Sequence, residues 1–417
     1  MSRLEPWLVS YGLLGLTQSG LVPVLMPLVA PHGTSAGLTF AAFSLLGVFA
    51  PILGSWADGT GRHRDLLIWG TLGAGALFLL YDAVSASLRI LFAVGAGLGA
   101  VAATTAGNVI AVQGMPESAW ESRVALLQRF VSAGQVIGLV AAGLLARTHP
   151  NDGFVFAGVA LLAAGALAFV SAPNRQAPGS RTMLLPRPIR GGDAGVFGPH
   201  HHGHHFSRRE LTAYLNVINR PMRLFLLIWL ISYAAMNGFA TLFPVVMVRQ
   251  FGMNPILPSG AYAIGVAFSL AIYSPVGMMT HRLGGERMLA VGFGARLAVL
   301  GLLLALSLLH VGSAAGWVVL AGFALIQFVW PLIAIAANSL SVRLMPTARG
   351  ESVGLFNAAT SLASAIGSAL AGVIYDVSGF TGLAAVVFTA VAAGLLLCEF
   401  RLRPHILARS DLRIPKI

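Results

Sequence analysis

Charged residues are scarce in this sequence. Only 10% of its 417 residues are Asp, Glu, Lys or Arg, whereas 57% are hydrophobic. Soluble domains carry about 25% charged residues, so this composition excludes a water-soluble fold. The single cysteine, Cys398, excludes an intrachain disulfide and a cysteine-ligated metal site. No Gly-rich loop ending in Lys-Ser or Lys-Thr occurs, which argues against direct use of ATP.

Long apolar stretches dominate instead. A transmembrane helix needs about 20 apolar residues, and no cleavable signal peptide is expected because the first stretch is itself long enough to span. Glycine and alanine recur within the stretches, as in helices that pack closely in lipid. The expected spans are 7–30, 36–57, 66–86, 88–112, 124–147, 154–173, 222–248, 258–280, 288–310, 314–340, 352–375 and 379–400.

The basic residues predict the orientation of these spans. With the N-terminus inside, the external loops hold only Arg89, Arg147 and Arg249, whereas the internal segments hold 21 basic residues. Such a bias places both termini in the cytoplasm. It also accounts for the net charge of +12 without a nucleic-acid partner.

A segment rich in Pro, Gly, Arg and His interrupts the apolar pattern. We expect an N-terminal six-helix bundle over 1–173, a cytoplasmic linker over 174–221, a second bundle over 222–400 and a basic cytoplasmic tail over 401–417. Residues 207–220 have apolar side chains at helical spacing and predict an amphipathic helix on the membrane surface.

The two bundles repeat each other. Two copies in the same orientation imply a twofold axis along the membrane normal, with a substrate path between them. The predicted fold is therefore an all-α integral membrane protein of twelve helices in two pseudo-symmetric six-helix bundles. The matching segments are 23–26 with 244–247, Gly54 and Gly61 with Gly277 and Gly284, Asn108 and 115–116 with Asn338 and 345–346, and Leu126 and Gly138 with Leu355 and Gly367.

The loop after the second span reads GSWADGTGRHR. It resembles the loop motif of the major facilitator superfamily, in which a Gly and an Asp precede a Gly-Arg-basic cluster. The sequence departs from the motif at Gly59, where a basic residue is usual, and at His281, which replaces the aspartate in the second copy. The resemblance implies a secondary transporter rather than an enzyme, with no cofactor. The key positions of the motif are Gly54, Asp58, Gly61, Arg62 and Arg64.

In that repeat geometry, Asp58 faces the start of the eleventh span near residues 351–354. A carboxylate there accepts hydrogen bonds from free backbone N–H groups and faces the positive end of the helix dipole. We expect this contact to hold the halves together on the inside and to favour the outward-open state. The alternative is that these charges only determine topology.

The fifth span carries Gly134, Gly138 and Gly143, which resemble the glycine-rich motif of proton-driven drug exporters. Leu139 stands where that motif has proline, and the fourth-helix arginine of those exporters is absent. Simple helix contacts are the alternative explanation for the glycines.

By analogy with the superfamily, spans 1, 4, 7 and 10 line the path. No Asp or Glu falls within them, although exporters of cations commonly carry a buried carboxylate. Asp82 and Glu399, near the ends of other spans, are expected at the membrane interface. The candidate lining residues are neutral: Gln18, Asn108, Tyr233, Asn237, Gln327, Trp330 and Asn338.

Two arginines fall inside spans, and a buried arginine is a functional candidate by default. Arg129 is a candidate to contact an anionic group of the substrate or to take part in coupling. An organic anion or a zwitterion is therefore one substrate class, and a neutral or amphiphilic compound is equally compatible. Arg296 lies on a span that is usually peripheral, where pairing with a backbone carbonyl or snorkelling is expected.

Five clustered histidines, a weak candidate metal site, lie in the linker. They can bind Zn, Ni, Cu or Fe, but such a tract is more often incidental. They are His200, His201, His202, His204 and His205.

The sequence thus predicts a monomeric, multi-pass carrier of the inner cell membrane. It would move a small organic molecule by alternating access, with a proton or another ion as a possible coupling partner. Export is favoured, and uptake of an organic anion or a metal chelate is the alternative. A polytopic membrane enzyme and a transporter-like sensor are the hypotheses from other classes.

Overall fold

The computed structural model describes residues 5–112, 117–173, 219–308, 314–344 and 349–408, and within them every regular element is a helix. Several predicted spans are built from more than one helical segment. The N-terminal half comprises α1 (Trp7–Leu14), η1 (Gly15–Leu21), α2 (Val22–Leu28), α3 (Gly33–Leu45), η2 (Leu46–Phe49), α4 (Ala50–Thr60), α5 (His63–Leu80), α6 (Ala86–Val112), α7 (Glu117–Thr148) and α8 (Asp152–Ser171).

The C-terminal half has the same order of spans. The seventh span begins at Arg220, two residues before the predicted start, and residues 403–408 of the predicted tail are helical. The elements are α10 (Arg220–Arg249), α11 (Ile256–Leu283), α12 (Gly285–Leu308), α13 (Ala314–Phe328), α14 (Trp330–Leu344), α15 (Arg349–Leu397), η3 (Cys398–Leu402) and α16 (Arg403–Ala408).

Among the described residues, ten helical stretches are long and apolar enough to cross a membrane. The last of them, Gly354–Ala408, contains Gly379 with non-helical φ and ψ of 63° and −163°, and so covers the two last predicted spans. The third predicted span, α5, is not among the ten, but it packs between α6 and α8 inside the N-terminal half. The twelve-helix prediction is consistent with this arrangement.

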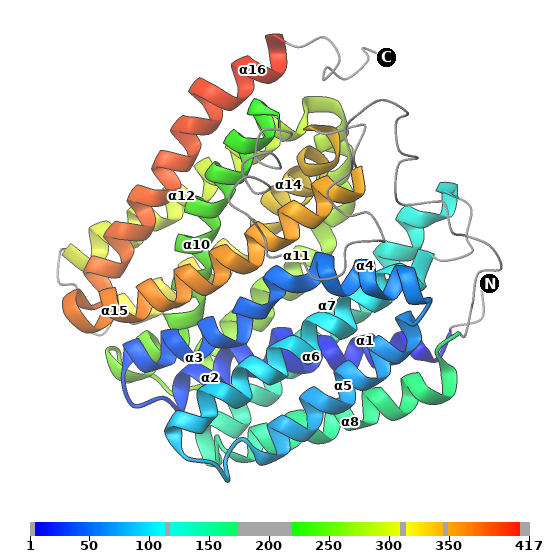
Figure 1. The fold of residues 1–417 in the computed structure, drawn as a ribbon. Coiled ribbons are helices and arrows are strands. Elements are labelled where there is room, and N and C mark those ends of the chain that lie inside the picture. The colour runs from blue at the N-terminus through cyan, green and yellow to red at the C-terminus, as the bar shows by residue number, and fades with distance from the viewer. Residues whose placement is uncertain (1–4, 113–116, 174–218, 309–313, 345–348, 409–417) are drawn as a thin grey trace, which may run out of the picture.

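Each half has its own hydrophobic core. One cluster is built almost entirely from the first six spans and includes Tyr11, Phe78 and Phe154, whereas the other is built from the last six and includes Trp229 and Phe243. Figure 1 shows the N-terminal half below the C-terminal half. Two cores of this kind allow the halves to move relative to each other as separate bodies.

Glycines repeat the same close packing in both halves. A Cβ on Gly138 of α7 would overlap the carbonyl oxygen of Leu16, and a Cβ on Gly367 of α15 would overlap that of Ala234. Gly138 and Gly367 are the repeat partners found in the sequence, 229 positions apart. Span 1 therefore contacts span 5 in the N-terminal half in the same way as span 7 contacts span 11 in the C-terminal half.

The contact between the halves is also duplicated. A Cβ on Gly372 would overlap the carbonyl oxygen of Gly33, and one on Gly143 would lie 3.1 Å from the Cα of Ile256. Gly143 and Gly372 are again 229 positions apart. Both contacts lie at the end of the bundle away from the start of α1 and the end of α16, and we call it the distal end. In Figure 1 the distal end is at the lower left, α1 begins at the right and α16 ends at the top.

Candidate functional site

A carboxylate of the C-terminal half caps a helix of the N-terminal half at the distal end. Asp376 accepts hydrogen bonds from the backbone nitrogens of Gly33, at 2.9 Å, and Thr34, at 2.6 Å. It also accepts a hydrogen bond from the Thr34 hydroxyl at 2.6 Å. Because α3 begins at Gly33, the negative charge lies at the positive end of the helix dipole, a favourable arrangement.

A guanidinium of the C-terminal half binds the preceding helix end. Arg249, the last residue of α10, donates hydrogen bonds to the carbonyl oxygens of Ala30 and of Pro31, the latter at 3.1 Å. These carbonyls follow directly after α2, so the positive charge lies near the negative end of that helix. Asp376 and Arg249, with residues 30–34 that they hold, form what we call the distal latch.

Polar side chains link the halves further along the same interface. Asn237 of α10 donates to the hydroxyl oxygens of Ser364, at 2.8 Å, and Ser368, at 3.2 Å. Ser364 in turn donates to the Ser44 hydroxyl oxygen of α3 at 3.1 Å. The predicted lining residue Asn237 is therefore connected to the opposite half through one serine.

Aromatic side chains gather where span 10 is interrupted. Trp229 and Tyr233 lie one helical turn apart on α10 and are stacked, with ring centroids 5.0 Å apart. The Trp330 ring lies 5.9 Å from that of Tyr233. Trp330 starts α14 after a break at Val329, and irregular backbone of this kind in transporter helices is found where it lines a cavity or site.

Arg296 lies behind this aromatic group and is only 4% exposed. It donates a hydrogen bond to the carbonyl oxygen of Ile326 at 3.1 Å, as the sequence predicted for a backbone pairing. Its guanidinium carbon lies 5.3 Å from the centre of the Trp330 ring. The side chain is thus turned into the bundle and does not snorkel.

In the N-terminal half, the predicted residue Gln18 lies in an irregular part of span 1. It belongs to the π-helix η1, and no residue in the described part of the chain accepts a hydrogen bond from its buried Nε2 atom. Single-turn π-helices inside α-helices are frequent at functional sites. Gln18 therefore offers a free hydrogen-bond donor on a predicted lining span.

The other predicted lining residues are spread out. Gln327 is buried, whereas the side chains of Asn108, Arg129 and Asn338 are exposed, and Asn338 donates to the carbonyl oxygen of Ala334. The structure thus brings Tyr233 and Trp330 together near Arg296, and places Arg129 at a surface.

The predicted inner gate is described only in part. Gly61 ends α4 with a φ of 70°, a conformation that glycine adopts without strain, and Arg62 precedes α5. A Cβ on Gly54 would only touch Thr105, at 3.4 Å. Arg64 donates to the carbonyl oxygen of Phe169. The side chains of Asp58 and of residues 349–353 lie outside the described part of the structure.

The predicted linker helix and the histidines at 200–205 also lie outside the described residues. Within the described ranges, no group of three or more His, Cys, Asp or Glu side chains could hold a metal ion. Asp82 and Glu399 form ion pairs near helix ends, with Arg89 at 3.0 Å and Arg403 at 2.6 Å.

Sequence reasoning missed the distal latch. Asp376 follows the predicted end of span 11 directly, so it read as a loop residue, and Arg249 was counted only as an external charge. A signal was present in the repeat: the position equivalent to Asp376, 229 residues earlier, is Arg147, so both copies carry a charged residue at this position.

Comparisons with known proteins agree with this architecture. A family profile described as the Major Facilitator Superfamily matches residues 7–368. The chain belongs to this superfamily. No curated protein sequence matches it.

Solved transporters of this superfamily share the fold. The nucleoside transporter NupG superposes with a TM-score of 0.71 at 15% identity, covering 96% of this chain and 98% of NupG. A D-xylose-proton symporter gives a TM-score of 0.69 at 13% identity, covering 94% and 96%. An inward-facing, occupied bacterial homolog of the human lysosomal transporter Spinster gives 0.65 at 13% identity, covering 97% and 95%. The protein is therefore a multi-pass membrane transporter rather than an enzyme.

Proposed function

We propose that the protein carries a small organic molecule across the inner cell membrane by alternating access. The distal end is the external face and both termini are cytoplasmic. In this assignment the structure is an inward-facing state, held closed on the outside by the distal latch.

The latch is the observation that carries the proposal. Asp376 and Arg249 belong to one half and bind backbone groups of the other, so both contacts break when the halves separate on that side. An interaction of a charged group with a helix end contributes about 1 kcal/mol. Two such contacts bias an equilibrium between two states without locking it.

Export is the direction we favour. The glycines of α7 resemble those of the exporters' fifth helix, although here Gly134 and Gly138 pack against span 1 and Gly143 against α11. Uptake is the alternative. Transport of the substrate could be coupled to a proton or to another ion. A coupled ion would bind to one of the two states, inward-open or outward-open, more tightly than to the other.

Purified protein in liposomes tests the proposal. Labelled substrate should enter vesicles preloaded with the same unlabelled compound. A carrier exchanges one external molecule for one internal molecule, so the label enters although the total amount of substrate inside does not change. A panel of small organic molecules chosen by thermal stabilisation supplies the candidates, since a ligand bound to the folded state raises its apparent stability. Absence of exchange with every stabilising compound would overturn the proposal.

A further inference from the structure

Arg296 is buried within α12, one of the helices long and apolar enough to cross a membrane. It is 4% exposed and lies at the middle of α12. Within the described ranges it forms no ion pair with a carboxylate. An arginine in this position is costly, and such residues mark substrate or ion sites more often than structural ones.

The hydrogen-bonding capacity of Arg296 is only partly used. A guanidinium has five N–H donors. One nitrogen donates to the carbonyl oxygen of Ile326, and another contacts the Met236 sulfur at 2.6 Å. The buried Nε has no hydrogen-bond partner among the described residues. A thioether is a weak acceptor. Among the described residues, the site therefore has spare donors and a positive charge that no carboxylate balances.

The surroundings of the guanidinium are aromatic. Trp330 lies against it, and Tyr233 adjoins Trp330 with ring centroids 5.9 Å apart. Tyr233 and Trp330 are both half-buried, whereas the neighbouring Trp229 is buried. The two half-buried rings thus offer flat apolar surface next to the charge, and Trp330 is carried by the break in span 10.

We propose that Arg296, Trp330 and Tyr233 form a binding site for an organic anion that carries an aromatic group. The anionic group pairs with Arg296 in the bidentate geometry that guanidinium favours, and the aromatic group packs against the two rings. This inference rests on the proposed function, because it names the substrate class of that carrier. A cationic substrate is disfavoured by the same uncompensated charge.

Ligand binding to the purified protein tests the site. The probes are 2-naphthoate, its neutral analogue 2-naphthamide and the non-aromatic cyclohexanecarboxylate, together with a panel of aromatic sulfonates and phosphates. Binding is read from tryptophan fluorescence and from thermal stabilisation. We expect at least one aromatic anion to bind about tenfold more tightly than its neutral or non-aromatic analogue, since hydrogen bonds to a charged group are strong. If no aromatic anion binds the wild-type protein, the proposal is wrong.

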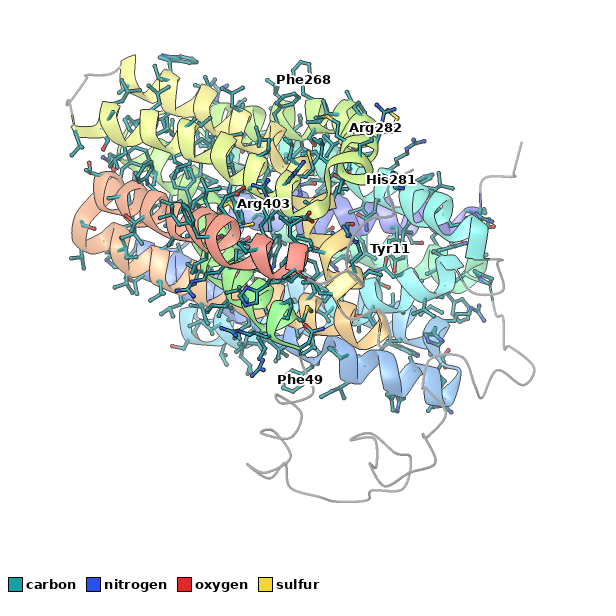
Figure 2. All side chains as sticks on the ribbon, turned by 90° about the horizontal axis from the view of Figure 1, so that it is seen from above. Tyr11, Phe49, Phe268, His281, Arg282 and Arg403 are labelled. Carbon is teal, nitrogen blue, oxygen red and sulfur yellow. The ribbon has the colours of Figure 1, made fainter. Side chains whose placement is uncertain are left out.

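Variants separate a binding role from a structural one. Arg296→Met removes the charge at similar length and should abolish the preference for the anion. Arg296→Lys keeps the charge but lacks the planar fork of the guanidinium, so it should retain only part of that preference. Arg282→Met is the matched control, because Arg282 projects from the surface of α11 (Figure 2) and should not change the preference. A monodisperse Arg296→Met protein that still prefers the anion would refute the assignment.

Failure of this inference can be told apart from failure of the proposed function. Exchange of a neutral or cationic substrate that is insensitive to Arg296→Met would disprove the anion site and leave the carrier standing. Binding of an aromatic anion without exchange of any compound would leave the site and disprove the carrier.

Discussion

The carboxylate of Asp376 lies 2.6 Å from both the backbone nitrogen and the hydroxyl oxygen of Thr34, although the two residues are 342 positions apart. The sequence predicted the same device, a carboxylate at a helix start, for Asp58 at the opposite face. The two are compatible in a protein that closes alternately on either side, because each carboxylate would stabilise one state.

Asp376→Asn should weaken external closure. The amide keeps one acceptor but loses the charge at the start of α3, so the outward-open state gains population. A cysteine at Ser44, which lies in the interface between the halves, should then react faster with a membrane-impermeant thiol reagent added outside. Asp82→Asn is the matched control, because that carboxylate pairs with Arg89 of its own half. Equal labelling of Asp376→Asn and the parent would contradict the latch.

Arg249→Gln should act on the same equilibrium. Its effect and that of Asp376→Asn should not add, because both residues hold residues 30–34 and one release loosens the other contact. The measurement is a double-mutant cycle on the Ser44 cysteine labelling rate. Strict additivity would mean that the two contacts are independent, contrary to a single latch.

Gly138→Ala should destabilise the protein. The added Cβ would overlap the carbonyl oxygen of Leu16, and backbone cannot yield as a flexible side chain would. Gly73→Ala is the matched control, because no atom of the described residues lies within 4 Å of its added Cβ. In a helix, alanine is favoured over glycine by about 1 kcal/mol. Thermal unfolding in detergent should therefore show a loss for Gly138→Ala and no loss for Gly73→Ala.

Asp58→Asn should leave the protein inserted and folded but slow its transport strongly. The motif around Asp58 predicts a contact that stabilises the state closed on the inside. Without this contact that state would be less populated, and the transport cycle would slow. Transport in liposomes, compared at equal amounts of monodisperse protein, provides the measurement. Wild-type kinetics in this variant would remove Asp58 from the gate.

The sequence was sufficient for the architecture because repetition and family motif constrain it strongly. Gly138 and Gly367 matched as repeat positions in the sequence, and in the structure each makes the same kind of close helix contact in its own half. Hydropathy also located the spans, but not their interruptions: the π-helix around Gln18 and the break at Val329 depend on packing against neighbouring helices.

The two arginines show what a single sequence does not reveal. Arg129 and Arg296 both fall within spans, and Arg129 was the preferred substrate candidate. In the structure Arg129 is exposed and Arg296 is buried beside Trp330. The difference in burial depends on how each helix is rotated about its axis, and a glycine- and alanine-rich span has too little amphipathicity to predict that rotation.

The turn between the last two spans has a mechanical consequence. Gly379 alone departs from helical geometry between two long arms of α15. Gln250, which follows α10, accepts a hydrogen bond from the backbone nitrogen of Phe380 just beyond that glycine. Because the turn consists of a single non-helical residue, we expect the two arms of α15 to move together. In the proposed orientation, we therefore expect a shift of Asp376 on release of Thr34 to move the returning arm and, through η3, α16 as well. The proposed external closure and the proposed cytoplasmic end of the chain would then move together.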